Sequence, residues 1–449
     1  MGNQVQESRR FDVAIIGAGI LGTATAYFLS SMNGLKVAVF EAESSSGFHA
    51  SSRNTGVIHR PFYLDPSKKG FIADAASESY DLWKVFASEY NLPWVQNGTL
   101  EVTNNDAGVR TIRSYERYAR ENGMDHTEFE ILDSSEIRRT YPSVNALCGI
   151  HSITDTSVDF GRFTAKLKEL SEANGVTYHF GSRVKNIIET KDGITIISET
   201  GGNLKTYFSR AAVNVGGAGS LRLARRMGLG KEFGLLLFRG DYWKVDPSFS
   251  PGFGFHLYTV PRYSRFPFLD PHFIIRWNGN MEIGPNASLV FSERAYTGMK
   301  PEISSLVESL RDSNLMPRIS LFGNTEFMSM VRSEWKSSME RGAMATRLRK
   351  FLPSLKDRFL TGRATGGIRG SLVDKSGFVP ELVTRKTERT IHVLNYNSPG
   401  ATGAPYVGFR IASWLMNSGL IRDEYNRKVI HREWERALDN FRDYREMNV

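Results

Sequence analysis

The chain begins with short apolar runs separated by a glycine-rich turn. Val13 to Ile16 form one run, and a second run, Val37 to Phe40, follows it closely. Between them, small and apolar residues recur at helical spacing after three glycines in the pattern G-x-G-x-x-G: Gly17, Gly19 and Gly22. This order predicts a strand, a tight turn, a helix and a second strand of a parallel nucleotide-binding sheet.

The sheet pattern is then interrupted. Residues 66–90 have helical spacing, and strand patterns return at residues 175–217, joined by Asp-Gly and Gly-Gly turns. The last of these strands ends at Gly216 and Gly217. An antiparallel ribbon followed by a strand that rejoins the parallel sheet predicts an interrupted Rossmann-like domain, with Val184 near the adenine side of its ligand.

The glycine pattern has a physical explanation at each position. Gly17 permits the tight turn, Gly19 lets the backbone approach a pyrophosphate, and Gly22 lets helix and strand pack closely. Phosphates would then lie at the positive end of the helix, where Ile20 and Leu21 supply backbone amides. The segment therefore predicts a dinucleotide site.

The next acidic residue helps to choose the dinucleotide. Glu41 ends the second strand, where a carboxylate can accept hydrogen bonds from a ribose diol and disfavours a 2′-phosphate. FAD or NAD is thus favoured over NADP. Simple strand and helix alternation does not continue after Glu41, which favours a flavoprotein over a plain nicotinamide dehydrogenase.

The stretch from His49 to Tyr63, "HASSRNTGVIHRPFY", is too rich in small and polar residues for a regular element. As a loop it offers amides and short side chains to flavin phosphates and the ring edge, although a loop capped by its own serines explains the composition equally. The candidate cofactor residues in it are Ser51, Ser52, Arg53, Asn54, Gly56 and Val57. His59 follows them, either as a surface histidine or as a functional one.

Composition changes this picture only slightly. The 449 residues, 41% hydrophobic and 23% charged, allow two to three cores, and the element order indicates an α/β protein, α+β overall. The formal charge of +9 allows attraction of an acidic substrate or peripheral contact with an anionic membrane. Basic residues are scattered, so we expect no nucleic-acid partner.

Neither a disulfide framework nor a metal site is expected. The chain has a single cysteine, Cys148, and no Cys/His spacing typical of zinc. The first residues lack the pattern of a signal peptide, and no apolar stretch is long enough to span a bilayer. A cytoplasmic location, with peripheral membrane contact at most, is the simplest expectation.

Several blocks together resemble a known family. "AIIGAGILG", "SRNTGVIH", "FRGDYWKV", "RFPFLDPHFIIRWNGNMEIGPNA", "GGIRGSLVDKSGFVPEL" and "LNYNSPGATGAPYVG" resemble the D-amino-acid oxidase superfamily of FAD-dependent oxidoreductases. Within it they are most similar to the L-2-hydroxyglutarate dehydrogenase/oxidase branch, near the FAD-dependent glycerol-3-phosphate dehydrogenases. The resemblance implies non-covalent FAD and two domains: a flavin domain of residues 1–75, 151–232 and 355–449, and an antiparallel-sheet substrate domain of residues 76–150 and 233–354.

The resemblance also implies site residues. His59 matches a histidine beside the flavin and would act as the base, and Arg369 would face the substrate carboxylate, with a surface arginine as the alternative. Further expected substrate contacts are Arg60, Tyr63 and Arg276. Further cofactor contacts, beside Gly216 and Gly217, are Gly367, Ser398, Gly400, Ala401 and Thr402.

The substrate stays open at this stage. Arg53 stands where the hydroxyglutarate branch has a histidine, and Arg60 and Pro61 replace a small pair after His59. The best guess is oxidation of L-2-hydroxyglutarate to 2-oxoglutarate by hydride transfer, with oxygen, a quinone or a protein carrier as electron acceptor. Alternatives are glycerol 3-phosphate, an amino acid or amine, and a flavin-binding protein without turnover. Residues 425–449 show the spacing of an amphipathic helix.

Overall fold

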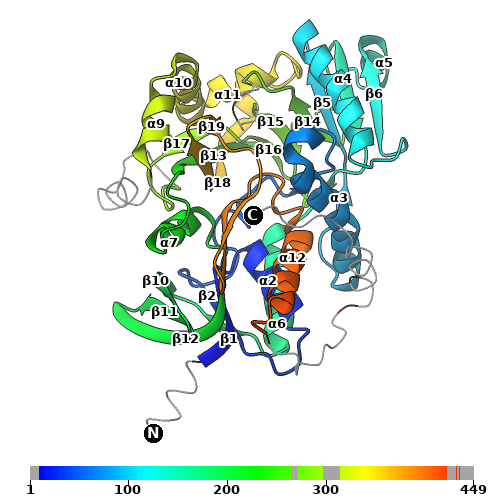
Figure 1. Cartoon of the computed structure of the whole chain (residues 1–449). Helices are drawn as coiled ribbons and strands as arrows, with labels where there is room; N and C mark the ends of the chain where they lie inside the picture. Colours follow the sequence, from blue (N-terminus) through cyan, green and yellow to red (C-terminus); the bar gives the residue numbers. More distant parts are fainter. Residues whose placement is uncertain are drawn as a thin grey trace.

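The computed structural model describes residues 10–263, 266, 270–296, 314–421, 431 and 434 (Figure 1). They form two large sheets with a cavity between them. The expected helix after residue 424 lies outside the described residues except for His431 and Trp434, as do Arg265, Pro267, Phe268 and Leu269 of the family-like middle block. No helix in the described part of the chain is long and apolar enough to cross a membrane.

The first sheet has a parallel centre in the order β21-β12-β1-β2-β9. These strands are β1 (Arg10–Ile16), β2 (Val37–Phe40), β9 (Thr177–His179), β12 (Asn203–Asn214) and β21 (Thr390–Asn395), with β20 (Val383–Lys386) antiparallel to β21. Every residue of β2 is buried, as expected for a strand covered on both faces. The predicted strand–turn–helix–strand order is therefore present.

The predicted ribbon is also present. It consists of β10 (Ser182–Thr190), β11 (Gly193–Thr200) and the first half of β12, joined by tight turns. The second half of β12 leaves the ribbon and runs parallel to β1, with Ala211 opposite Val13. One long strand thus belongs to both the ribbon and the parallel sheet, which confirms the interrupted Rossmann-like fold.

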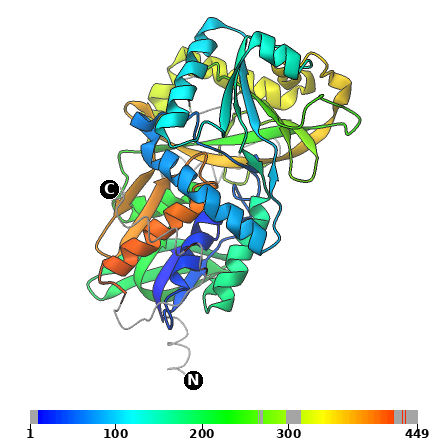
Figure 2. The same ribbon diagram turned by 90° about the vertical axis from the view of Figure 1, so that its right-hand side faces the viewer.

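Four helices cover one side of this sheet (Figures 1 and 2). They are α2 (Ile20–Leu29), α3 (Pro66–Glu89), α6 (Phe160–Ala173) and α12 (Ala404–Asn417), and the short α7 (Ser220–Arg226) packs near the ribbon. Trp83 of α3 is fully buried in their common core, and its indole N–H donates to the carbonyl of Thr402 at 2.8 Å. The long helix therefore ties the core to the loop before α12.

The second sheet is antiparallel except where β14 runs parallel to β5. Its strands are β5 (Thr99–Thr103), β6 (Phe129–Asp133), β7 (Cys148–Ser152), β13 (Gly234–Val245), β14 (His256–Thr259), β15 (His272–Ile275), β16 (Met281–Gly284), β17 (Ser288–Val290), β18 (Leu360–Asp374) and β19 (Gly377–Phe378). Its helices are α4 (Asp106–Glu121), α5 (Ser134–Thr140), α9 (Leu315–Phe322), α10 (Thr325–Met339) and α11 (Arg341–Leu348). A small third sheet joins β3 (Val57–Ile58), β8 (Thr156–Ser157) and β4 (Val95–Gln96).

Two stretches lie elsewhere than the expected domain limits put them. β18 and β19, which were assigned to the flavin segment 355–449, belong to the second sheet, because β18 pairs with β13 along almost its whole length. α3, much of which was assigned to the substrate segment 76–150, packs in the core of the first sheet. Long-range pairing and a buried helix face decide both placements, and neither is visible in local sequence.

Candidate active site

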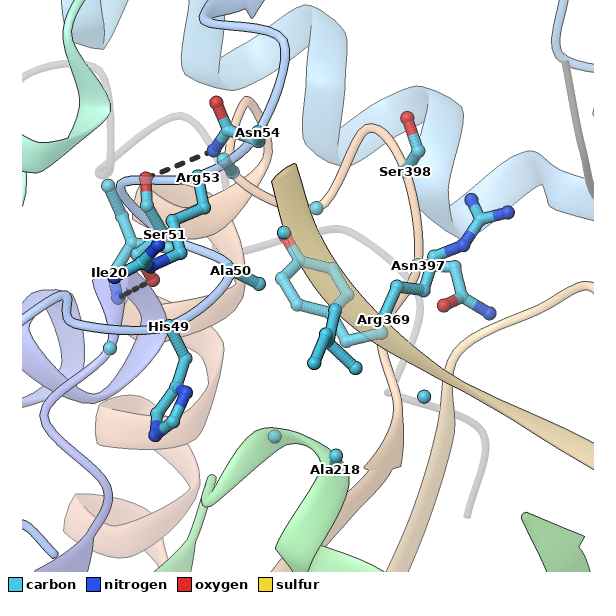
Figure 3. Close-up of a pocket in the computed structure, with 18 of the residues that line it drawn as sticks. Ile20, His49, Ala50, Ser51, Arg53, Asn54, Ala218, Arg369, Asn397 and Ser398 are labelled. Carbon is cyan, nitrogen blue, oxygen red and sulfur yellow. Dashed lines mark hydrogen bonds between the residues drawn. The ribbon is translucent and has the colours of Figure 1, made fainter. Parts of the chain in front are cut away.

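A cavity of about 650 Å³ opens between the two sheets. Figure 3 shows part of its wall, with Ile20 and the loop from His49 to Asn54 on one side, and Arg369, Asn397 and Ser398 on the other. The wall combines the loops after β1 and β2, the end of β12, the middle of β18 and the loop before α12. Segments distant in sequence therefore meet at one site.

The nucleotide end of the cavity is built from backbone. Gly17 has a φ of +105°, and a Cβ atom at Gly22 would lie 1.9 Å from the carbonyl oxygen of Gly17. The Ala18 amide donates to Glu41 Oε2 at 2.8 Å, and the Ile20 amide at the start of α2 donates to Ser51 Oγ at 2.9 Å. These two hydrogen bonds fix the positions of the Gly17 turn, the start of α2 and Glu41 relative to the loop of Ser51.

The loop that continues this wall is held from several sides. Asn54 Oδ1 accepts from the Gly56 amide at 2.8 Å, which forms a tight Asx turn. The guanidinium of Arg53 lies over the ring of Tyr296, 4.3 Å from its centroid. Arg276 donates through Nη1 to the Asn54 carbonyl at 2.8 Å, so the second sheet also fixes the loop.

His59 follows this loop and lines the cavity. Its Nδ1 lies 2.8 Å from Oδ2 of Asp155, which is fully buried. A carboxylate can only accept, so Nδ1 carries a proton, and in the neutral tautomer of this ring the lone pair is on Nε2. The hydroxyl of Tyr258 lies 3.5 Å from Nε2. The imidazole is therefore held at both ring nitrogens, by Asp155 and Tyr258, in the wall of the cavity.

Asp155 is stabilised as an anion. Burial alone would raise its pKa, but the hydrogen bond and charge of His59 and the bonds from the Arg60 amide and Ser152 Oγ bring the pKa below its usual value. Thr99 Oγ1 also donates to Oδ2 at 2.8 Å. An ionised carboxylate in this position both orients the His59 ring and stabilises its protonated form.

Two aromatic side chains stack beside His59. The rings of Tyr258 and His272 are parallel within 6°, with centroids 3.6 Å apart, and both line the cavity. Burial, with a further effect of the charges of His59 and His256, lowers the pKa of His272 well below its usual value. His272 is therefore neutral, and its Nδ1 has no hydrogen-bond partner among the described residues.

A buried acid lies behind this group. Glu101 of β5 is 3% exposed, and its Oε1 has no partner among the described residues. Burial and then the charge of Asp155 raise the pKa of Glu101 to about 8. Glu101 is therefore protonated at neutral pH, beside a carboxylate that is ionised.

The end of the cavity near the loop before α12 carries two cations. Arg369 of β18 lies there beside Asn397 and Ser398 (Figure 3), and Lys69 of α3 lines the cavity close enough for the charge of Arg369 to lower its pKa. Burial lowers the pKa of Arg369 to about 10, against a smaller opposing effect of Tyr242. A guanidinium remains charged at neutral pH, so this end is suited to an anion.

Most residues predicted from sequence line the cavity, and four do not. Those in its wall are Gly17, Gly19, Ile20, Leu21, Glu41, Ser51, Arg53, Asn54, Gly56, Val57, His59, Tyr63, Val184, Gly216, Gly217, Gly367, Arg369, Ser398, Gly400, Ala401 and Thr402. Those outside it are Gly22, Ser52, Arg60 and Arg276.

The two arginines outside the wall have other contacts. Arg60 donates through Nη2 to Glu128 at 2.9 Å and lies over the ring of Tyr80. Arg276 binds Glu282 at 2.6 Å as well as the loop carbonyls. The structure thus places both side chains in supporting contacts instead of the expected substrate contacts. Arg60 is buried and Arg276 is partly buried, and an arginine removed from water requires such partners.

Sequence reasoning assigned no role to Asp155, Tyr258, Glu101 or Lys69. Asp155 lies 96 positions from His59, and no local pattern connects them. The only sequence feature that points to Lys69 is a pair of lysines within the first turns of the predicted helix. By itself such a pair indicates a solvent-exposed helix face.

The chain is similar to known oxidoreductases along most of its length. A family model described as FAD dependent oxidoreductase (DAO) matches residues 12–414. The mitochondrial L-2-hydroxyglutarate dehydrogenase of Caenorhabditis elegans is 29% identical over 416 residues, 91% of this chain and 94% of that protein. L-2-hydroxyglutarate dehydrogenase of Escherichia coli K12 is 27% identical over 409 residues, 90% of this chain and 92% of that protein.

Solved structures share the fold. The FAD-bound L-alpha-glycerophosphate oxidase of Mycoplasma pneumoniae superposes with a TM-score of 0.69 at 20% identity, covering 91% of this chain and 95% of that one. Glycine oxidase of Geobacillus kaustophilus gives a TM-score of 0.67 at 17% identity, covering 93% and 97%. These structures confirm the two-sheet fold, and the family model confirms the resemblance found in the sequence.

The residues present fit FAD. The Gly17 turn and the start of α2 bring backbone amides to the nucleotide end of the cavity, as a pyrophosphate requires, and Glu41 lines the same cavity, where it can accept from a ribose. A Cβ atom on Gly367 would lie 2.6 Å from the Arg53 carbonyl oxygen, so glycine is needed where β18 meets the loop. Cys148 is buried in β7 and does not line the cavity.

Proposed function

Because the chain belongs to the family of FAD-dependent oxidoreductases, we propose that it oxidises an anionic 2-hydroxy acid, L-2-hydroxyglutarate, to the 2-oxo acid. The Gly17 turn, the start of α2 and Glu41 would hold FAD, which would supply the acceptor for a hydride from the substrate carbon that carries the hydroxyl. The hydroxyl proton leaves to a base of the protein, and the two electrons pass on to an acceptor. The observation that carries the proposal is the His59–Asp155 pair in the wall of a cavity that also contains Arg369.

His59 is the base in this proposal. Its Nε2 takes the hydroxyl proton, and the resulting imidazolium is stabilised by Asp155 through the Nδ1 hydrogen bond. Tyr258 limits the movement of the ring on its other side. The His59 amide also donates to Thr402 Oγ1 at 3.2 Å, so the backbone at the base is fixed to the loop before α12.

Arg369 binds the carboxylate next to the reacting carbon. A planar guanidinium offers two parallel hydrogen bonds to a carboxylate and so fixes the direction of the substrate. Partial burial strengthens this interaction, because water competes less for the anion. The two named relatives, each covered over nine tenths of this chain, support L-2-hydroxyglutarate as the acid.

A second candidate is glycerol 3-phosphate. It is supported by the fold of the Mycoplasma pneumoniae glycerophosphate oxidase and by the two cations at one end of the cavity, which also suit a phosphate. Amino-acid oxidation is a third, supported by the glycine oxidase fold. The electron acceptor, the cytoplasmic location and peripheral membrane contact stay predictions.

Anaerobic mixing tests the proposal. The purified yellow protein is mixed with L-2-hydroxyglutarate, D-2-hydroxyglutarate, glycerol 3-phosphate, L-lactate, L-malate and glycine, and flavin absorbance is followed. We expect the L-2-hydroxyglutarate sample to lose its flavin absorbance fastest, with 2-oxoglutarate formed in equal amount. Bleaching by glycerol 3-phosphate or glycine alone would overturn the substrate, and bleaching by none of the acids or the amine would favour a flavoprotein without this turnover.

A further inference from the structure

Two adjacent lysines at the start of α3 have opposite surroundings. The side chain of Lys68 is 72% exposed and pairs with Asp65 at 3.5 Å. Lys69 has φ −138° and ψ 28°, outside the helical range, although its amide still donates to the Asp65 carbonyl at 2.8 Å. This irregular residue lines the cavity, whereas its neighbour does not.

Lys69 carries a charge that the protein leaves largely uncompensated. Burial lowers its pKa, and the nearby charge of Arg369 lowers it further. Glu381 and Asp65 act in the opposite direction, but Asp65 pairs with Lys68 and Glu381 accepts from the Leu382 amide. Within the described part of the chain, Lys69 Nζ forms neither a hydrogen bond nor an ion pair.

The cavity wall supplies no acidic partner for this charge either. Of the described residues that line it, two are acidic, Glu41 and Glu293. Glu41 belongs to the nucleotide end and accepts from the Ala18 amide, and Glu293 pairs with Arg222 at 3.6 Å. Lys69 and Arg369 are thus two cations in one wall with no lining carboxylate between them. A ligand with two separated negative groups would complement them.

We propose that Lys69 binds the distal carboxylate of the substrate and so selects 2-hydroxy acids with two carboxylates over those with one. The assignment rests on the proposed function, in which Arg369 binds the carboxylate at the reacting carbon. A lysine suits the distal group, because a point charge on a flexible stem needs less exact geometry than the guanidinium beside the reacting atoms.

Binding of inert analogues tests the role without turnover. Glutarate has two carboxylates and no hydroxyl, and valerate has one carboxylate on a chain of the same length. Each is titrated into the FAD-loaded protein, and its Kd is obtained from the change in flavin absorbance. In Lys69→Met we expect the Kd of glutarate to rise about 10- to 100-fold, the range for a lost hydrogen bond between charged groups, and that of valerate to change less than about threefold.

Two further variants serve as controls. Lys69→Arg keeps the charge and is expected to keep the preference for glutarate, and Lys68→Met should bind both anions as the wild type does. Melting temperatures show whether each variant is folded. Equal weakening of glutarate and valerate in Lys69→Met, or no weakening of glutarate, would overturn the inference.

The outcomes separate this inference from the proposed function. If glutarate binding depends on Lys69 but L-2-hydroxyglutarate does not reduce the flavin, the function is wrong and the anion site stands. If L-2-hydroxyglutarate reduces the flavin of Lys69→Met with unchanged KM, the function stands and the role of Lys69 is wrong.

Discussion

The two ends of the cavity are built in different ways. At the nucleotide end, one continuous stretch from Gly17 to Glu41 supplies a turn, a helix start and a carboxylate, and backbone atoms set the geometry. At the substrate end, side chains from α3, β18 and the loops around His59 and Asp155 meet, and charge sets the chemistry. The first end tolerates almost no added atom, whereas the second depends on the identity of its polar groups.

The largest expected effect is at the substrate end. Replacing His59 with Gln keeps the size and polarity of the side chain but removes the base, and general base catalysis contributes about 10² to 10⁴ in rate. We expect the anaerobic rate of flavin reduction by L-2-hydroxyglutarate to fall about 10³-fold while FAD content stays unchanged. His126→Gln, at a histidine whose side chain is 80% exposed, is the control. A His59→Gln rate within threefold of the wild type would exclude His59 as the base.

At the nucleotide end, a steric clash should reduce both the stability of the protein and its binding of FAD. In Gly22→Ala the new methyl group would lie 1.9 Å from the Gly17 carbonyl oxygen, a backbone atom that cannot yield easily. We expect the free energy of unfolding to fall by about 3 kcal/mol and the purified protein to lose most of its FAD. Denaturant titration and flavin absorbance measure the two effects.

Gly254→Ala is the matched control, because no atom lies within 4 Å of its added Cβ. Normal FAD content and stability in Gly22→Ala would show that the helix start can shift, and would remove the contrast between the two ends.

The smallest effect concerns the acid behind the substrate end. The folded protein holds a proton on Glu101 up to a pKa of about 8, whereas an unfolded glutamate releases it near its ordinary value of 4.5. Stability from this group is therefore complete below the ordinary value and is lost as pH rises towards 8. Glu101→Gln keeps a neutral side chain at all pH values, so we expect it to be more stable than the wild type by about 1–3 kcal/mol at pH 8.5 and equal to it at pH 4.

Unfolding curves at both pH values measure this difference. Glu121→Gln, at an exposed glutamate, should show no such pH dependence relative to the wild type. A Glu101→Gln variant that is destabilised equally at both pH values would indicate that the carboxyl makes a specific hydrogen bond instead.

The same contrast explains what could be predicted from the sequence. The nucleotide end is formed by one continuous stretch of sequence. The spacing of Gly17, Gly19 and Gly22 before Glu41 was therefore enough to predict both its fold and the class of its ligand. The loop of His59 was found by its unusual polarity and by family resemblance. Asp155 and Lys69 were missed, because their roles arise only when segments far apart in the chain, or a local break in a helix, bring them to the cavity.

Long-range strand pairing also explains why the domain boundaries could not be predicted correctly from the sequence. The strand around Arg369 looks like part of the flavin segment in sequence, yet it hydrogen-bonds along β13 in the second sheet. Arg276 shows the reverse case, because an arginine in an apolar strand suggested an anion site and proved to hold the loop carbonyls and Glu282. Tertiary structure decides which group an arginine contacts. The sequence position of an arginine therefore does not tell whether it binds a ligand or stabilises the protein itself.

The link through Arg276 has a consequence for protein engineering. Arg276 follows β15 in the second sheet and donates a hydrogen bond to the loop that leads to His59. The sheet that forms part of the pocket therefore also positions the base. Mutations in β15 or β16 made to admit a bulkier acid would shift the loop as well. Mutant libraries aimed at new substrates should therefore keep Arg276 and Glu282 and vary other residues of the cavity wall. Catalytic turnover should then be retained when the substrate range changes.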